Sequence, residues 1–219
     1  IDLKDFFPSI DQARVWARLK YPPFNLNEEN NRLTIANRIA SLCCQKMDVE
    51  RLDADKNWII ENRNVLPQGA PTSPFLTNVI CQKLDHQLST LAAKFNLSYT
   101  RYADDITFSS MHNVYKSGSP FIEKMEQIIS EQGFTIKEAK TRLQKQGYRQ
   151  EVTGLVVNEK VNVHRHMIKQ VRLWLFYWEK FGIERASIYF LSSYRKSKIL
   201  PAHGTPDLMN VIGGKLDFI

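Results

Sequence analysis

Two adjacent aspartates in the middle of an apolar, alternating stretch are the feature that most restricts the fold of this chain. Residues 97–110 read LSYTRYADDITFSS, with apolar or aromatic side chains recurring on both sides of Asp104 and Asp105. A period of two predicts strands, so this stretch is expected to form a hairpin with the acidic pair in its tight turn. Carboxylates held side by side repel one another, and folding gains nothing from burying them together. A divalent cation removes that conflict, because Mg²⁺ prefers hard oxygen ligands.

Taken alone, an Asp-Asp pair in a turn is more often ordinary turn chemistry, because aspartate is a frequent turn residue. Two other segments change this balance. Residues 2–10 read DLKDFFPSI and place Asp2 on an expected opening strand, while residues 66–74 read LPQGAPTSP, a Pro/Gly loop that leads into a helix. Together with the YADD sequence at 102–105, these segments resemble, in the same order, three catalytic motifs of reverse transcriptases, the RNA-directed DNA polymerases.

Two later segments extend the resemblance over nearly the whole chain. Residues 134–141, FTIKEAKT, resemble a further motif of that family, and residues 152–158, VTGLVVN, are similar to a segment of its retron-type bacterial members. The resemblance implies an α+β fold, the right-hand polymerase, with a palm made of an antiparallel sheet with helices on one face, partial fingers and a helical thumb. The palm is then expected at 1–11 and 66–160, the partial fingers at 12–65 and the thumb at 161–219.

Both ends of the chain fall within apolar patterns. Ile1 opens a run that reads as an interior strand, and residues 216–219 end the chain without a cap or a polar tail. The chain is therefore expected to be a fragment of a longer polypeptide, with the upstream finger strands missing. Activity of the fragment by itself is expected to depend on those strands.

The resemblance assigns the acidic residues to a two-metal site. In such polymerases a primer 3′-hydroxyl attacks the α-phosphate of a nucleotide and pyrophosphate leaves in line, while two metal ions stabilise the attacking and leaving oxygens. By resemblance, Asp2 and Asp104 bridge two Mg²⁺ ions. Asp105 completes the acidic cluster, and the backbone carbonyl of Leu3 is a further metal ligand. Mn²⁺ is the expected substitute ion.

Further residues are assigned by resemblance to the substrates. The ring of Phe7 is expected to crowd the 2′ carbon of the sugar and so to favour deoxynucleotides. Gln68 and Gly69 are expected to contact the incoming nucleotide and the template, and Ala103 to border the substrate within the YADD turn. Lys140 is expected to act at the leaving pyrophosphate, where it can donate a proton or a charge-assisted hydrogen bond.

These side chains also have plainer interpretations. Phe7 can be a core aromatic beside Phe6, although neighbours on a strand face opposite sides, so that only one of the two is easily core. Gly69 can simply serve the turn before the next helix. Lys140 can be one more solvated lysine in the basic run 137–149.

Charge is distributed unevenly along the 219 residues, whose net charge is +7. Residues 1–136 carry 15 basic and 16 acidic side chains, whereas residues 137–219 carry 15 basic and 7 acidic ones. The basic part is expected to contact phosphates of a template–primer duplex. The partners implied are an RNA template, a DNA or RNA primer and deoxynucleoside triphosphates, with a structured noncoding RNA and an effector protein as further candidates.

The expected function is RNA-directed DNA synthesis of the retron type, in which DNA is made from a noncoding RNA for phage defence. Three alternatives remain open: a template-independent defence polymerase of the same fold, a group II intron-type enzyme, and a non-catalytic nucleic-acid-binding scaffold. Loss of Asp2, Asp104 or Asp105 would favour the scaffold, and all three are present. No apolar run approaches 18 residues, so no membrane partner is expected and a bacterial cytoplasmic location is favoured.

Several other residues are interpreted as structural rather than catalytic. The three cysteines, Cys43, Cys44 and Cys81, lie in apolar helical patterns, which favours buried, reduced thiols. His164 and His166 are interpreted as surface residues, Trp174 and Trp178 as packing residues, and Asp5 and Asp11 as non-catalytic. The expected elements are helices at 15–19, 33–47 and 75–91, a helix from Ser119-Pro120 to Gly133, a helical region from Arg165, a hairpin at 48–66 and strands at 134–136 and 152–157.

Overall fold

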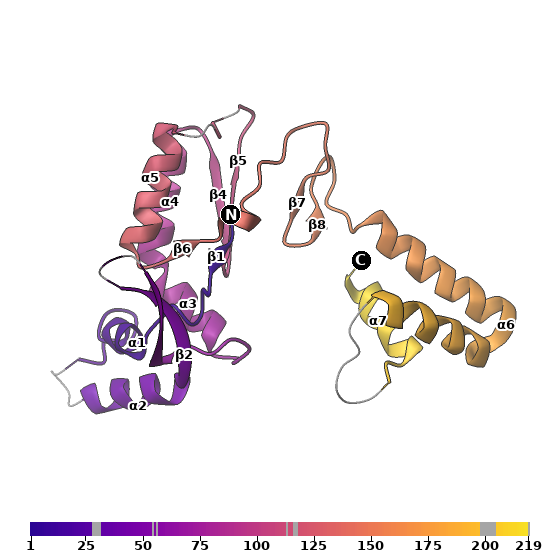
Figure 1. The fold of residues 1–219 in the computed structure, drawn as a ribbon, viewed down its shortest axis with the longest axis horizontal. Helices are drawn as coiled ribbons and strands as arrows, with labels where there is room; N and C mark the ends of the chain where they lie inside the picture. Colours follow the sequence, from indigo (N-terminus) through magenta and orange to yellow (C-terminus); the bar gives the residue numbers. More distant parts are fainter. Residues whose placement is uncertain are drawn as a thin grey trace. The chain divides into compact units, whose positions relative to one another are not determined.

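The computed structural model describes residues 1–27, 32–53, 55, 57–112, 114–115, 118–197 and 205–218. The chain divides into two compact units, Ile1–Leu143 and Gln144–Ile219 (Figure 1). Helices alternate with short antiparallel strand pairs along the chain, which confirms the α+β class. None of the helices among the described residues is both long enough and apolar enough to span a membrane.

Short antiparallel strands form the centre of the first unit. An isolated bridge between Asp2 and Asp105 joins two of its strand pairs, so that segments far apart in the sequence lie side by side. The pairs are β1 (Leu3–Lys4) with β6 (Thr135–Ile136), and β4 (Ser98–Tyr102) with β5 (Asp105–Ser109).

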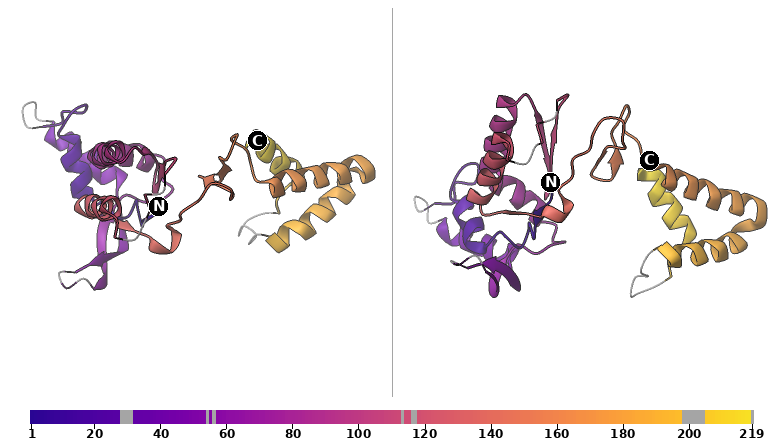
Figure 2. Two further views of the ribbon diagram at one scale, coloured as in Figure 1. Left: turned by 90° about the horizontal axis from the view of Figure 1, so that it is seen from above. Right: turned by 45° about the horizontal axis from the view of Figure 1, so that its top comes forward.

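Helices α4 (Gln82–Lys94) and α5 (Pro120–Glu131) lie side by side against the β4–β5 hairpin (Figure 2). Leucines recur every three or four residues along α4, which places them on one buried stripe. The ring of Phe108 on β5 meets that of Phe121 on α5 edge-on, with 5.1 Å between centroids. The core of this unit includes Leu3, Phe6, Ile10, Leu84, Leu88, Leu91, Ile106, Phe121 and Phe134.

The predicted helix at 33–47 is too long. Helix α2 covers Leu33–Cys43, Cys44 is extended, and the strand β2 begins at Gln45. Strands β2 (Gln45–Leu52) and β3 (Trp58–Val65) form an eight-residue antiparallel ladder, which outweighs the local spacing of apolar residues. The hairpin expected at 48–66 therefore exists but starts three residues earlier.

The predicted helix at 75–91 consists of two helices. Helix α3 (Ser73–Ile80) begins two residues earlier than predicted, at the Ser-Pro pair that ends the loop, and α4 follows it after Cys81. Cys81 is fully buried, as expected, whereas Cys43 and Cys44 are only partly buried because they lie at and just beyond the end of α2. Helix α1 (Gln12–Leu19) precedes α2 and includes the expected helical segment at 15–19.

The capping signals around α5 are confirmed. Ser119 is its N-cap, with the hydroxyl accepting a hydrogen bond from the Ile122 N–H, and Pro120 is the first helical residue. Gly133 follows the helix with φ 73°, a left-handed conformation that glycine adopts without a steric penalty. The expected strand at 134–136 follows as β6.

The second unit consists of a short hairpin and a helical part. Helix α6 (Arg165–Ser197) starts where predicted and is interrupted at Gly182, whose φ of 80° and ψ of 166° are not helical. Trp174 and Phe190, from either side of this break, meet edge-on, and α7 (Leu208–Phe218) packs on them. Trp174 is 1% exposed and Trp178 packs against the same cluster, which confirms the packing interpretation of both.

The predicted strand at 152–157 is instead a tight hairpin. Strands β7 (Glu151–Val152) and β8 (Leu155–Val156) are joined by Thr153 and Gly154, both with positive φ. Two consecutive residues with positive φ make a two-residue hairpin turn, for which a Gly at the second position is well suited. The apolar residues on either side of Gly154 therefore pair with one another rather than continue one strand.

Candidate active site

Backbone hydrogen bonds bring the three predicted acidic residues together. The Leu3 N–H donates to the Asp104 carbonyl at 3.0 Å, and the Ile106 N–H donates to the Ile1 carbonyl at 2.8 Å. These bonds flank the bridge between Asp2 and Asp105. The first strand of the chain is thus aligned with the tip of the β4–β5 hairpin, as an acidic cluster requires.

The turn that carries Asp104 is strained. Tyr102 pairs with Asp105, so Ala103 and Asp104 alone form the loop. Ala103 has φ 51°, in the left-handed region. A residue with a Cβ loses about 1–2 kcal/mol in that conformation, which persists only where its surroundings hold it.

Lys140 contacts one of the three acidic residues directly. Its ammonium nitrogen lies 3.0 Å from Oδ2 of Asp2, with half of the lysine side chain exposed. Among the described residues, no three His, Cys, Asp or Glu side chains are gathered in a way that could hold a metal ion. The donors nevertheless fit a hard divalent cation in kind, because the three residues offer carboxylate oxygens.

The predicted sugar-contacting ring lies at the edge of the core. Phe6 is 3% exposed and stacks on Phe134 with 5.3 Å between centroids, while Phe7 meets Phe6 edge-on and is only partly buried. One of the two rings is core, as expected, but not by strand alternation: β1 ends at Lys4, and both rings lie in the turn that follows. Phe7 keeps a partly accessible face.

Gln68 and Gly69 lie exposed in the loop before α3. Gly69 has φ 89°, and a Cβ built on it would meet no atom within 4 Å, so its glycine serves the backbone conformation rather than close packing. The loop is anchored elsewhere: the Leu66 N–H donates to the Ile10 carbonyl, and the buried Ser73 hydroxyl donates to the Pro67 carbonyl at 2.7 Å.

Sequence reasoning missed a buried arginine beneath the acidic turn. The Arg101 side chain is 5% exposed and forms a two-pronged ion pair with Asp85 of α4, at 2.7 Å for both Nε and Nη2. Tyr99 donates its hydroxyl proton to the same carboxylate at 2.7 Å. The alternation of the strand could have indicated this burial. Leu97, Tyr99 and Arg101 lie on the same face of the strand, and Leu97 is buried.

The pKa values of Arg101 and Tyr99 reflect their burial and their contacts with Asp85. Burial by itself lowers the pKa of the Arg101 guanidinium, but the hydrogen bonds and charge of Asp85 outweigh it and raise that pKa above its ordinary value. Burial, followed by the hydrogen bond to Asp85, raises the pKa of the Tyr99 phenol. Arg101 is thus charged and Tyr99 neutral under all physiological conditions.

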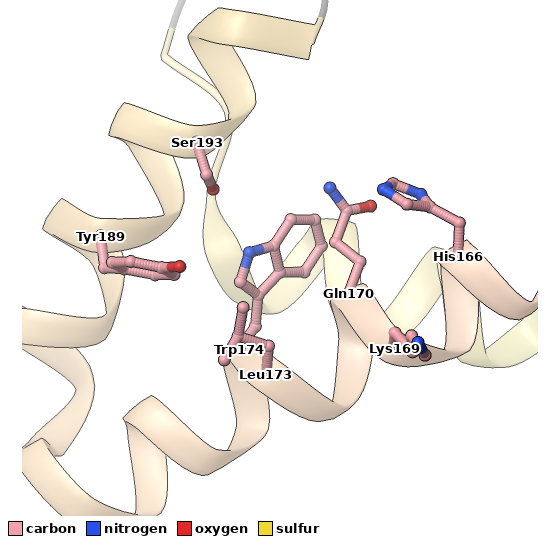
Figure 3. Close-up of a pocket in the computed structure, with 7 residues that line it drawn as sticks. All are labelled: His166, Lys169, Gln170, Leu173, Trp174, Tyr189 and Ser193. Atoms are coloured by element: carbon pink, nitrogen blue, oxygen red, sulfur yellow. The ribbon is translucent and has the colours of Figure 1, made fainter.

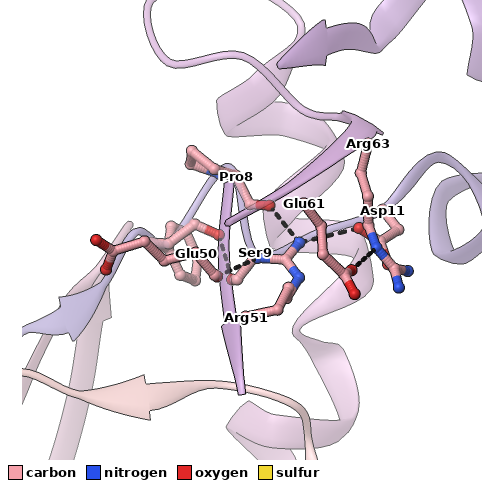
Figure 4. Close-up of polar contacts among 8 residues, drawn as sticks. Pro8, Ser9, Asp11, Glu50, Arg51, Glu61 and Arg63 are labelled. Atoms are coloured by element: carbon pink, nitrogen blue, oxygen red, sulfur yellow. Dashed lines mark hydrogen bonds and ion pairs between the residues drawn. The ribbon is translucent and has the colours of Figure 1, made fainter. Parts of the chain in front are cut away.

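The hairpin β2–β3 anchors the segment that follows Phe7 (Figure 4). Arg51 donates to the Pro8 carbonyl at 2.7 Å and to Oδ1 of Asp11 at 2.9 Å. Arg63 reaches the other oxygen of Asp11 at 3.3 Å; its pKa is raised by its hydrogen bond to Glu61 and by the charges of Glu61 and Asp11. Two arginines therefore occupy the Asp11 carboxylate, in agreement with its non-catalytic interpretation.

A small cavity of about 210 Å³ lies between the two halves of α6 (Figure 3). Trp174 and Tyr189 form much of its wall, and His166 and Lys169 lie at its border. His164 instead pairs with Glu151 across 3.1 Å. Neither histidine belongs to a metal-binding group within the described residues.

Residues 1–170 match the family model described as "Reverse transcriptase (RNA-dependent DNA polymerase)". The chain belongs to the reverse transcriptase family. The matched range includes the acidic turn, the opening strand, the Pro/Gly loop and Lys140. Because the model covers more than half of the chain, the predicted family is confirmed.

Several retron enzymes are similar to this reverse transcriptase chain. It is 34% identical over 188 residues to the retron Mx162 reverse transcriptase of Myxococcus xanthus, covering 78% of this chain and 37% of that protein. It is 37% identical over 175 residues to the retron Ec86 reverse transcriptase of Escherichia coli, covering 78% and 46% respectively. The predicted resemblance to the retron group is confirmed, and the chain spans about two fifths of the length of these relatives.

Proposed function

We propose that this chain carries the catalytic carboxylates of an RNA-directed DNA polymerase, which adds deoxynucleotides to a primer 3′-hydroxyl on an RNA template. The observation that supports the proposal best is the pairing of Asp2 with Asp105, next to the hydrogen bond from Leu3 to the Asp104 carbonyl. This arrangement gathers the acidic residues of two family motifs at one place on the molecule.

Asp2, Asp104, Asp105 and the Leu3 carbonyl would hold two Mg²⁺ ions, for which Mn²⁺ can substitute. When bound, such ions lower the pKa of the attacking hydroxyl and offset the charge that develops on the leaving pyrophosphate. The chain itself supplies the alignment of the carboxylates through the backbone bonds of Leu3 and Ile106.

Lys140 supplies a second cationic group at this place. Its ammonium group already lies against Asp2, so it neutralises that carboxylate while the substrate is absent. From there it can donate a hydrogen bond to an incoming phosphate oxygen and a proton to the departing pyrophosphate.

The substrate roles rest on the family motifs and on exposure. The accessible face of Phe7 would exclude a ribose 2′-hydroxyl, and Ala103 would border the substrate within the turn. Gln68 and Gly69, exposed in their loop, would contact the nucleotide and the template. A hydrogen-bonded loop that presents a Gly without a neighbouring side chain allows the backbone to approach a nucleotide closely.

The wider assignment follows the same resemblance. Residues 1–11 and 66–160 would form the palm, 12–65 part of the fingers, and 161–219 the thumb, whose basic side chains would contact the duplex phosphates. The names of the relatives support a retron-type role, and a bacterial cytoplasm is the location proposed for it. That role would include a structured noncoding RNA, an effector protein and phage defence.

Primer extension on an RNA template, with Mg²⁺ or Mn²⁺ and the full-length protein, tests the proposal. Asp104→Asn should reduce nucleotide addition by about 1,000-fold while the protein stays folded, as judged by circular dichroism. Asp53→Asn is the matched control, because Asp53 lies near the tip of the β2–β3 hairpin and caps backbone N–H groups of residues 55 and 57. Full extension by Asp104→Asn would contradict the assignment.

The product distinguishes the alternatives. A DNA whose sequence ignores the added template would identify a template-independent polymerase, and no product from the wild-type protein would favour a binding scaffold. Sequencing of the nucleic acid that co-purifies with the protein separates a retron RNA from a group II intron.

A further inference from the structure

We propose that Arg101 is a positioning residue that fixes the acidic turn to the two neighbouring motifs and so sets the affinity of the site for its divalent cations. This inference rests on the proposed polymerase function. It goes beyond that function in giving a role to a residue that is neither a carboxylate nor a substrate contact.

One guanidinium group connects all three motif regions. Besides its ion pair with Asp85 of α4, Arg101 donates from Nη1 to the Ala103 carbonyl at 3.0 Å and from Nη2 to Oδ1 of Asn78 at 3.4 Å. Its Cζ also lies 5.9 Å from the centre of the Phe6 ring, within the range of a cation–π contact. Asn78 and Asp85 follow the Pro/Gly loop, Phe6 follows Asp2, and Ala103 is the turn itself.

The hydrogen bond to Ala103 falls on the strained residue of the turn. A left-handed alanine persists only where the surrounding structure holds it, and the Arg101 contact is directed at its carbonyl oxygen. Asp104 is the next residue, and its own carbonyl accepts from the Leu3 N–H. Movement of the Ala103 peptide would therefore displace Asp104 relative to Asp2.

Stability alone does not explain an arginine at this position. A buried ion pair is often no more stabilising than well-packed apolar residues of similar volume. The planar fork of a guanidinium, in contrast, can reach a carboxylate, a carbonyl and an amide at once in fixed directions, which a lysine cannot do. Ligands of a metal site need such positioning to within about 0.5 Å.

The test compares Arg101→Lys with Arg18→Lys in the full-length protein. Arg18 is the control, because its guanidinium makes three hydrogen bonds, to the Val79 and Pro22 carbonyls and to Oε1 of Gln82, and two of these lie on the same pair of helices that Arg101 contacts. It makes none of its hydrogen bonds to the β4–β5 hairpin. Replacing the Arg18 guanidinium with a lysine ammonium therefore measures how much stability an arginine-to-lysine substitution costs at these helices.

Arg101→Lys should raise the Mg²⁺ concentration for half-maximal extension about tenfold. It should lower kcat by about 100-fold, with the KM for deoxynucleotide changed less than about twofold. Two measurements do not depend on turnover. Mn²⁺ binding, followed by electron paramagnetic resonance, should weaken to a similar degree, and amide hydrogen exchange across residues 102–105 should accelerate. Arg18→Lys should change the melting temperature without changing either readout.

The outcomes separate the two proposals. A wild-type protein that does not extend a primer overturns the polymerase function itself. If the wild type is active and Arg101→Lys matches Arg18→Lys in Mg²⁺ dependence and in exchange of the turn, Arg101 is only structural and the inference is wrong. Should Arg101→Lys not fold, Asp85→Glu replaces it, because the longer carboxylate keeps the charge but displaces the guanidinium. Unchanged Mn²⁺ binding and turn exchange in Asp85→Glu would equally overturn the inference.

Discussion

Two tight hairpins, β4–β5 in the first unit and β7–β8 in the second, each hold a residue with a side chain in the left-handed conformation, but different contacts stabilise that conformation in each. Each is closed by two residues and includes a side chain in the left-handed region, Ala103 with φ 51° and Thr153 with φ 49°. In the second hairpin a glycine follows at once, and a Cβ added to Gly154 would meet no atom within 4 Å. In the first hairpin the support is a buried guanidinium.

The difference lies in what specifies each turn. The β7–β8 turn has local turn chemistry and a partly exposed contact between His164 and Glu151 at 3.1 Å. The β4–β5 hairpin has tertiary partners on three elements, Asn78 on α3, Asp85 on α4 and Leu3 on β1, which fixes its position relative to the rest of the unit. Charge differs too: residues 1–143 carry 18 basic and 17 acidic side chains, whereas residues 144–219 carry 12 and 6. A nearly balanced unit with a buried ion pair suits precise placement of groups, and a basic unit suits contact with a polyanion.

The largest expected effect comes from removing the partner of the buried guanidinium. Asp85→Ala leaves Arg101, with a side chain 5% exposed, without its counter-charge. This should lower the free energy of unfolding of the first unit by about 3 kcal/mol. The equivalent change in the second unit, Glu151→Ala, breaks a more exposed pair and should cost about 0.5 kcal/mol. Denaturant unfolding followed by hydrogen exchange measures both, and equal losses would contradict the contrast.

The same contrast explains what could be predicted from the sequence. Turn and capping chemistry is local, so the hairpin around Asp104, the N-cap at Ser119 and the glycine stop at Gly133 were predicted correctly. The family motifs also predicted that Asp2 lies in one cluster with Asp104 and Asp105, and the structure pairs Asp2 with Asp105. The roles of these carboxylates in catalysis stay predictions.

Features determined by tertiary contacts were missed. The ladder of β2 with β3 makes strand residues of 45–47, which were predicted to be helical because Met47 fits the spacing of the apolar residues before it. The pairing of Val152 with Leu155 likewise turned one predicted strand into a hairpin. Arg101 was passed over because a charged residue next to an acidic motif resembles a solvated side chain until its burial is known.

Exchanging glycine and alanine in the two turns should change stability by a smaller amount. Gly154→Ala places a Cβ on a residue with φ 83° and should lower the stability of the second unit by about 1 kcal/mol. Ala103→Gly relieves strain but adds freedom to the unfolded chain, so the free energy of unfolding of the first unit should change by less than about 0.5 kcal/mol. Amide hydrogen exchange, resolved to each hairpin, measures both changes in the free energy of unfolding. A large stabilisation by Ala103→Gly would mean that the turn is not held by its surroundings.

A loss of stability at alkaline pH, confined to the first unit, is smaller than the effect of Gly154→Ala. Burial raises the pKa of the Cys81 thiol from 9.0 to about 11; the charge of Asp85 adds to this, and those of Arg101 and Arg14 oppose it. The folded unit therefore retains a proton that the unfolded chain loses above pH 9, so stability falls as the pH rises toward 11. Between pH 8 and 9.5 the loss should be roughly 0.8 kcal/mol.

All three cysteines belong to the first unit, so the second lacks this contribution. Cys81→Ala provides the control, because it removes the thiol while its packing cost is the same at every pH. The measurement is therefore the slope of the unfolding free energy against pH, read by hydrogen exchange in each unit. A slope that persists unchanged in Cys81→Ala would assign the alkaline loss to another group, with the Cys44 thiol, whose pKa burial likewise raises from 9.0 to about 11, as the next one to replace.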